Sequence, residues 1–312
     1  MRDRSHPLEL LRQAAVRRDQ SGVRRRLVPR GADHDGLVDL ASNDYLGLGG
    51  DQRLTAGAAR AAQEWGTGAT GSRLVTGTTA LHTRLEARLA EFAGAQAALV
   101  FSSGYLANLT VLSALAPALG GPDEVLIVSE AGNHASLIDG CRLARARVTV
   151  LAAPEVIGTL SGTGRGFIFD TGLAPPSVGA ALAALEVVAA EPELGARARA
   201  AAVRLAAIAA EEGLRVSAPD AAVLAVTVGE SAVAVRSQKA CAAYGVRVGC
   251  FRPPSVPRGQ ACLRLVGRAS LTEDDFAAAA RALAAVRDRG KLQHAKPVAA
   301  APRHSPFMLS TI

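Results

Sequence analysis

The sequence predicts an α/β protein with a large first domain and a smaller α+β domain towards the C-terminus. Short apolar runs alternate with segments of helical periodicity as far as residue 151, and this alternation stops in residues 152–166. Helices and strands resume near residue 176. With 312 residues and 49% hydrophobic content, the chain can bury a sizeable core. We predict an N-terminal arm at 1–36, an incomplete large domain at 37–175, a small domain at 176–289 and a disordered tail at 290–312.

The N-terminal part predicts a short amphipathic helix from Pro7 to about Val16. The basic run Arg24–Arg26 follows, and its simplest interpretation is a solvent-facing helix end. Leu37–Ala41 has the composition of a strand and leads into Ser42–Gly47.

The next stretch, Gly66–Arg73, contains too many glycines for a helix or a central strand, so it predicts a shaped loop. Its small residues allow close backbone approach to a ligand or to a partner subunit. A helix is predicted from about Thr79 to Ala93, and Gly94 is its natural stop.

The region Ala97–Leu109 changes from strand-like to helical composition at Ser102–Tyr105. Free backbone N–H groups at a helix start, together with the helix dipole, suit a phosphate. Tyr105 adds a flat ring, which suggests pyridoxal phosphate more than a nucleotide, because neither common nucleotide signature occurs here. An ordinary strand-to-helix turn fits the same residues.

Two strands, Glu124–Ser129 and Arg147–Leu151, are predicted on either side of a helix that begins near Asn133. His134 in that helix start also fits a capping or packing role. The following residues, Ala152–Gly166, have loop composition. Their glycine cluster resembles a phosphate loop, but no helix follows it, so we predict a flexible connector. The strand-like run Phe167–Phe169 ends this part.

The C-terminal part predicts four helices and three strands. The helices are Pro176–Ala190, Ala196–Glu212, Ala232–Tyr244 and Glu273–Arg287, and the strands are Ala222–Val228, Val246–Phe251 and Cys262–Val266. The last helix has the clearest start, because Thr272 and Asp275 form a capping-box pattern and Leu271 and Phe276 a hydrophobic staple.

Composition argues against several classes of protein. The net charge of +7 and the pI near 9.8 admit a nucleic-acid binder, but the arginines are scattered and few aromatics lie among them, as in a solvated surface. The four cysteines lack metal-ligand spacing, so we expect no metal and free thiols in a reducing cytoplasm. No stretch predicts a signal peptide or a membrane span.

Four motifs follow one another in the order of a known family. They are Ser-Asn-Asp-Tyr-Leu-Gly at 42–47, Gly-Ala-Thr-Gly-Ser-Arg-Leu-Val-Thr-Gly at 68–77, Phe-Ser-Ser-Gly-Tyr-Leu-Ala-Asn at 101–108 and His-Ala-Ser-Leu at 134–137. In these the chain resembles the α-oxoamine synthases, pyridoxal phosphate enzymes with the aspartate aminotransferase fold (fold type I). That family joins an amino acid to an acyl thioester with loss of carbon dioxide. Cys250–Pro257 and Phe167–Pro175 resemble the branch that condenses a pimeloyl thioester with L-alanine in biotin biosynthesis.

The resemblance implies a homodimer that binds pyridoxal phosphate, L-alanine and a pimeloyl thioester of coenzyme A or acyl carrier protein. The residues implied to contact the cofactor are Gly104, Tyr105, His134, which would stack on its ring, and Thr171, which would reach its phosphate across the dimer interface. Those implied to contact substrates are Arg24, Asn43, His134 and Arg264. Val266 stands where the family usually has threonine, which weakens the expectation of one acyl contact.

The resemblance also indicates that the central segment of the large domain is missing. In the family, the region matching 152–166 holds an aspartate that pairs with the pyridine nitrogen and a lysine that forms the Schiff base. The only lysines here are Lys239, Lys291 and Lys296, and none matches that position. We therefore predict no catalytic lysine, no covalent cofactor and no activity of the chain alone. The alternatives are a lysine-less partner subunit of a related enzyme and an arginine-rich nucleic-acid binder.

Overall fold

The computed structural model describes residues 7–21, 24–25, 27–32, 34–120, 124–125, 127, 133–144, 163–164, 166, 169–219, 221–253 and 255–291. The chain divides into two compact units. One joins Met1–Asn43 to Arg199–Ile312 and is called the terminal unit here. The other, Asp44–Ala198, is called the central unit.

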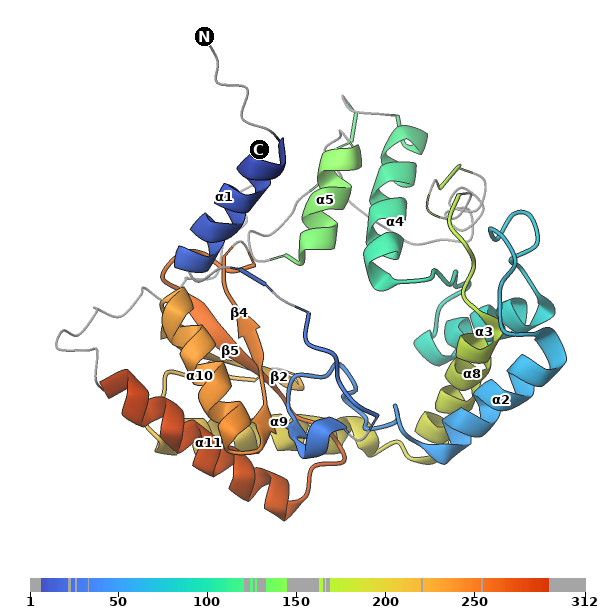
Figure 1. The fold of residues 1–312 in the computed structure, drawn as a ribbon. Helices are drawn as coiled ribbons and strands as arrows, with labels where there is room; N and C mark the ends of the chain where they lie inside the picture. The colour runs from blue at the N-terminus through green and yellow to red at the C-terminus, as the bar shows by residue number, and fades with distance from the viewer. Residues whose placement is uncertain are drawn as a thin grey trace, which may run out of the picture. The chain divides into compact units, whose positions relative to one another are not determined.

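The terminal unit is built on a three-stranded antiparallel sheet of order β2-β5-β4 (Figure 1). The strands are β2 (Val223–Gly229), β4 (Gly249–Phe251) and β5 (Ala261–Val266), and Leu224 lies opposite Leu265. A separate parallel pair joins β1 (Val38–Asp39) to β3 (Val246–Arg247). The three C-terminal strand predictions are confirmed, whereas the predicted strand at 37–41 is reduced to two residues.

Helices α9 (Leu194–Glu211), α10 (Ser231–Ala243) and α11 (Glu273–Lys291) contribute to the same hydrophobic core as the sheet. The fully buried leucines of this core are Leu40, Leu205, Leu224, Leu263, Leu265 and Leu283. The capping box before α11 is confirmed, since the Thr272 amide donates to Asp275 Oδ2 at 2.8 Å and the Asp275 amide donates to Thr272 Oγ1 at 3.3 Å. At the N-terminus, α1 (Pro7–Gln20) runs past the predicted end at Val16, and the short 3₁₀ helix η1 (His34–Gly36) precedes β1.

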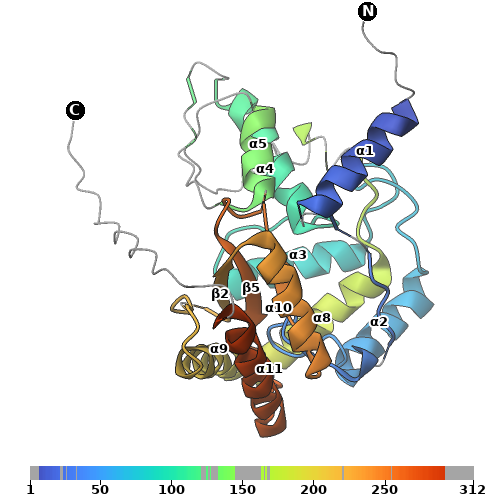
Figure 2. The same cartoon turned by 60° about the vertical axis from the view of Figure 1, so that its left-hand side comes forward.

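The described part of the central unit is mainly helical (Figure 2). It contains α2 (Gln52–Trp65), α3 (Ala80–Ala93), α4 (Gly104–Ala118), α5 (Ala135–Ala144) and α8 (Pro175–Ala190). Helix α8 packs against α2 and α3, and α4 packs against α5. Gly94 ends α3 in the left-handed conformation, as predicted.

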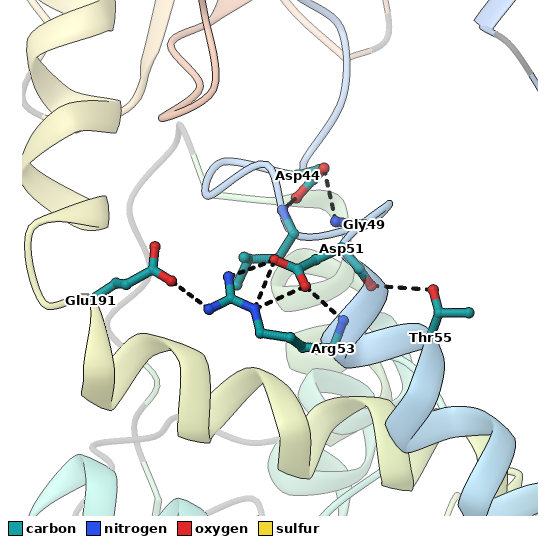
Figure 3. A network of polar contacts seen from close by, with 7 residues as sticks. Asp44, Gly49, Asp51, Arg53, Thr55 and Glu191 are labelled. Carbon is teal, nitrogen blue, oxygen red and sulfur yellow. Dashed lines mark hydrogen bonds and ion pairs between the residues drawn. The ribbon is translucent and has the colours of Figure 1, made fainter.

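Helix α2 has no counterpart among the sequence predictions. Its start is fixed by Asp51, which accepts a hydrogen bond from the Arg53 amide at 2.8 Å. Figure 3 shows the Arg53 guanidinium between Asp51 and Glu191. One Nη of Arg53 lies 2.7 Å from Asp51 Oδ2, and the other lies 2.5 Å from Glu191 Oε1. Because Glu191 is the C-cap of α8, these ion pairs tie the start of α2 to the end of α8. Helix α8 is predicted in the small domain, whereas it packs against α2 and α3 within the central unit. The other predicted domain limits stay a prediction.

The predicted strand at Ala97–Phe101 is wrong: these residues belong to no strand or helix in the structure. A strand exists only where a neighbour pairs with it, and the described residues of the central unit contain no strand ladder, only isolated bridges such as Ser72–Thr171. The predicted strand Arg147–Leu151 and most of the connector 152–166 lie outside the described residues. Of Phe167–Phe169 only Phe169 is described, and it forms a bend.

Candidate cofactor and substrate sites

The Ser102–Tyr105 turn passes from extended chain into α4, as predicted. Ser103 is the N-cap, and its Oγ accepts from the Leu106 amide at 3.2 Å. Gly104 opens the helix, and a Cβ added there would meet no atom within 4 Å. Ser102 Oγ donates to Asp170 Oδ2 at 2.5 Å, which ties the turn to the segment containing Thr171. Exposed N–H groups on an open helix start suit a phosphate.

Tyr105 ends this turn and is an exposed residue, with a fractional exposure of 47%. Its hydroxyl donates to Asp139 Oδ2 of α5 at 2.8 Å. This hydrogen bond to a carboxylate raises the pKa of Tyr105, so the phenol stays neutral at physiological pH. Asp139 is absent from the sequence predictions, because its role depends on how α4 packs on α5.

His134 directly precedes α5 and is exposed. Its Nδ1 accepts from the Ser136 amide at 3.2 Å and lies 2.7 Å from Ser136 Oγ. Ser136 Oγ also accepts from Asn108 Nδ2 of α4 at 2.9 Å, so it donates its own proton to His134 Nδ1. The capping role is present, while stacking on a cofactor ring stays a prediction.

Thr171 lies against the glycine-rich loop, where it forms an isolated bridge with Ser72. The Gly172 amide donates to the Gly71 carbonyl at 3.0 Å. A Cβ added at Gly172 would lie 2.7 Å from the Gly77 carbonyl oxygen, so only glycine allows this approach. The loop therefore permits close backbone contact with another segment of the same chain. The predicted approach to a ligand or a partner subunit, and the contact of Thr171 with a partner subunit's cofactor, stay predictions.

The predicted substrate residues Arg24, Asn43 and Arg264 lie in the terminal unit. An Arg264 Nη donates to Asn43 Oδ1 at 2.5 Å, and the guanidinium carbon lies 5.8 Å from the centre of the Phe251 ring. Arg264 and Phe251 also line an open pocket of about 220 Å³. Arg24 pairs with Asp19, five residues before it.

Arg25 and Val266 lie close in the sequence to the predicted substrate residues Arg24 and Arg264. Arg25, next to Arg24, donates to Ser255 Oγ at 3.2 Å, which brings Arg25 to the segment Cys250–Pro257. Val266 is fully buried at the end of β5 and has no hydroxyl to offer a ligand.

The central unit contains no lysine anywhere in its sequence. Lys239 occupies an exposed position of α10, Lys291 is the last residue of α11, and Lys296 lies outside the described residues. Burial raises the pKa of the Cys241 thiol to about 12, so it is no candidate nucleophile. Within the described ranges, no three His, Cys, Asp or Glu side chains are grouped as a metal site. None of the described helices has the length and apolar character needed to cross a membrane.

His82 is a fully buried side chain that connects α3 to the chain following Thr171. Its Nε2 donates to the Leu173 carbonyl at 2.7 Å, and its Nδ1 accepts from the Thr79 amide at 3.3 Å. Burial lowers the pKa of His82 below its ordinary value of 6.5. The neutral form with the proton on Nε2 satisfies both contacts.

We expect acidification to destabilise the protein through His82. Because the pKa of His82 is lower in the folded chain than in the unfolded chain, the unfolded chain takes up a proton first as the pH falls below about 6.5. The free energy of unfolding therefore decreases as the pH drops through that range. The midpoint of thermal unfolding, compared at about pH 7.5 and about pH 5.5, measures this loss of stability. His82→Gln, which keeps a donor and an acceptor, should lose part of the pH dependence; an unchanged dependence would contradict this role.

The family profile and similar curated proteins point to the same family. The sequence profile for "Aminotransferase class I and II" matches residues 35–153 and 149–283, so its two matched stretches meet at residues 149–153. An 8-amino-7-oxononanoate synthase of Mycobacterium sp. (strain JLS) is 40% identical over 380 positions, covering 90% of this chain and 97% of the relative. One of Mycolicibacterium smegmatis is 39% identical, covering 89% of this chain and 96% of the relative. The first alignment is longer than the 312-residue chain itself.

Solved structures share the fold at low sequence identity. A lysine-to-alanine variant of a serine palmitoyltransferase from S. paucimobilis, with a bound PLP–myriocin aldimine, has a TM-score of 0.76 at 20% identity, covering 93% of this chain and 99% of its own. An 8-amino-7-oxononanoate synthase from Francisella tularensis has a TM-score of 0.67 at 18% identity, covering 83% of this chain and 99% of its own. The predicted fold type I architecture is therefore confirmed.

Proposed function

Because the chain belongs to the class I and II aminotransferases, and among them to the pyridoxal phosphate-dependent 8-amino-7-oxononanoate synthases of biotin biosynthesis, we propose that its substrates are L-alanine and a pimeloyl thioester. The reaction of this lineage forms a carbon–carbon bond between alanine and the acyl group and releases the thiol and carbon dioxide. The observation that carries the substrate assignment is the Arg264–Asn43 contact beside the Phe251 pocket.

The proposed roles follow from the chemistry of each side chain. The guanidinium of Arg264 has paired donors that match the carboxylate of alanine, and Asn43 holds this group in place. Arg24 is assigned to the pimeloyl substrate. The N–H groups at Gly104 and Tyr105 fit the cofactor phosphate, and the exposed face of His134 fits its ring. Thr171 would serve the partner copy of a homodimer. When bound, the cofactor supplies an electron sink for the α-carbon.

We further propose that the chain alone does not complete this reaction. Its residues fit the phosphate and the ring of the cofactor, but covalent attachment does not fit, because the central unit has no lysine. Two observations support a missing segment between the predicted strands at 147–151 and 167–169. The profile matches meet at 149–153, and the alignment to the Mycobacterium relative is longer than the chain.

The alternative is a non-catalytic subunit that pairs with a full-length relative. Retention of the Ser102–Tyr105 turn and of Thr171 without a lysine favours it, since Thr171 is assigned to the partner's cofactor. In such a pair, the full-length chain would supply the amine. This chain would contribute Thr171 and structural support.

The experiment is release of labelled carbon dioxide from carboxyl-labelled alanine, with pimeloyl-coenzyme A and pyridoxal phosphate. We expect none from the purified chain and steady release from the full-length Mycobacterium relative as the positive control. Turnover by the chain alone would contradict the proposed inactivity. Co-purification of the two chains, with a mixed dimer that depends on Thr171, would favour the subunit alternative.

A further inference from the structure

Arg73, in the glycine-rich loop, is 7% exposed and has three separate hydrogen-bond partners. Its Nε donates to Thr78 Oγ1 at 2.9 Å, one Nη to the Val100 carbonyl at 3.0 Å, and the other Nη to Glu86 Oε1 at 2.8 Å. The planar guanidinium suits such a fixed set of contacts, which a lysine could not reproduce.

Glu86 of α3 completes the arrangement. Its Oε1 also accepts from the Val100 amide at 2.9 Å. The side chains of Arg73 and Glu86, which are 5% and 15% exposed, therefore bind both backbone polar groups of one residue. An extended residue normally finds these partners on a neighbouring strand. At Val100, which lies outside any strand, a buried ion pair takes that place.

Val100 directly precedes the motif Phe101–Asn108 and lies two residues before Ser102. Fixing its amide and carbonyl sets the direction in which the chain enters α4. The Ser102–Asp170 hydrogen bond holds the same turn through a second contact. A shift of the turn by about 1 Å would misplace the N–H groups assigned to the phosphate.

We propose that the Arg73–Glu86 pair is a positioning device that holds the Ser102–Tyr105 turn in the geometry that binds the cofactor phosphate. The inference rests on the proposed function for the assignment of this turn to the cofactor. The pair itself contacts Val100 and acts through it.

The test compares Glu86→Gln and Arg73→Lys with the wild type. Glu86→Gln keeps a carbonyl acceptor but removes the charge. Arg73→Lys replaces the planar guanidinium and its several N–H donors by a single ammonium group. We expect each to weaken equilibrium binding of pyridoxal phosphate by about tenfold or more, measured by fluorescence titration, while far-UV circular dichroism is retained. Hydrogen exchange should accelerate at the amides of residues 100–105 more than in α2 or α8.

The matched control is Glu91→Gln on the same helix. Glu91 pairs with Arg88 at 3.2 Å on the surface, with side chains 75% and 42% exposed, so its loss should change neither the affinity nor the exchange. Wild-type affinity in both buried variants, or exchange that rises equally throughout the central unit, would overturn the inference.

Two further outcomes separate this inference from the proposed function. If the wild type fails to bind pyridoxal phosphate, the cofactor assignment fails, while the exchange pattern still tests the clamp on Val100. If a variant does not fold, the wild-type exchange decides. A Val100 amide that exchanges as fast as an exposed loop amide overturns the clamp, and a protected amide supports it.

Discussion

Replacing Gly179 by leucine is expected to lower the free energy of unfolding of the central unit by about 3 kcal/mol or more. Gly179 lies where α8 packs on α2, facing Gly57. A Cβ at position 179 would lie 2.5 Å from the Gly57 carbonyl oxygen and 2.5 Å from Ala61 Cβ. Backbone atoms and a methyl group cannot rotate away, so the two helices would have to separate. Even Gly179→Ala should destabilise, although alanine gains about 1 kcal/mol of helix propensity over glycine.

The control for this prediction is Ala189→Leu, at an exposed position of the same helix. It adds apolar volume without meeting α2 and should change stability by no more than about 0.5 kcal/mol. Urea unfolding followed by circular dichroism measures both variants. Equal unfolding midpoints for Gly179→Leu and wild type would show that the α2–α8 contact is not close.

Sequence patterns predicted the terminal unit well, because the apolar runs there form strands that pair with one another in one sheet. Strands β2, β4 and β5 lie where the apolar runs predict them, and Leu224 pairs with Leu265 within one sheet. The start of α11 was predictable for a local reason: the reciprocal bonds of Thr272 and Asp275 lie within three residues of sequence.

The central unit was less predictable for two physical reasons. The run at Ala97–Phe101 has strand composition, but its state depends on pairing that the described residues do not provide. Helix α2 was not predicted, and its buried residues, Gly57 and Ala61, are small, so its packing against α8 cannot be inferred from large apolar side chains. Close approach of two backbones through glycine is visible only once the helices are placed.

The candidate site shows the same division. Sequence motifs alone identified Gly104, Tyr105 and His134, and the structure places them at helix starts. The partners Asp139 and Asn108 were missed, since they follow from the packing of α4 on α5. The spacing of Asn108 one helical turn after Gly104 was a usable signal, because residues four apart share a helix face.

The second large effect expected is the complete absence of a specific covalent cofactor adduct. An enzyme of this family holds its cofactor on a lysine, and no lysine occurs in the central unit of this chain. The exposed Lys239 should react slowly and without saturation, as any surface amine does with an aldehyde. The variant Lys239→Ala removes the contribution of this residue to the background and serves as the control; Lys291 and Lys296 account for the remaining adducts.

The measurement is the intact mass and peptide map of the 312-residue chain after pyridoxal phosphate and borohydride, with and without L-alanine. We predict scattered adducts that rise in proportion to the added cofactor and are indifferent to alanine. A saturating adduct of about one per chain at a single lysine, displaced by alanine, would contradict the absence of the attachment residue and with it the proposed inactivity.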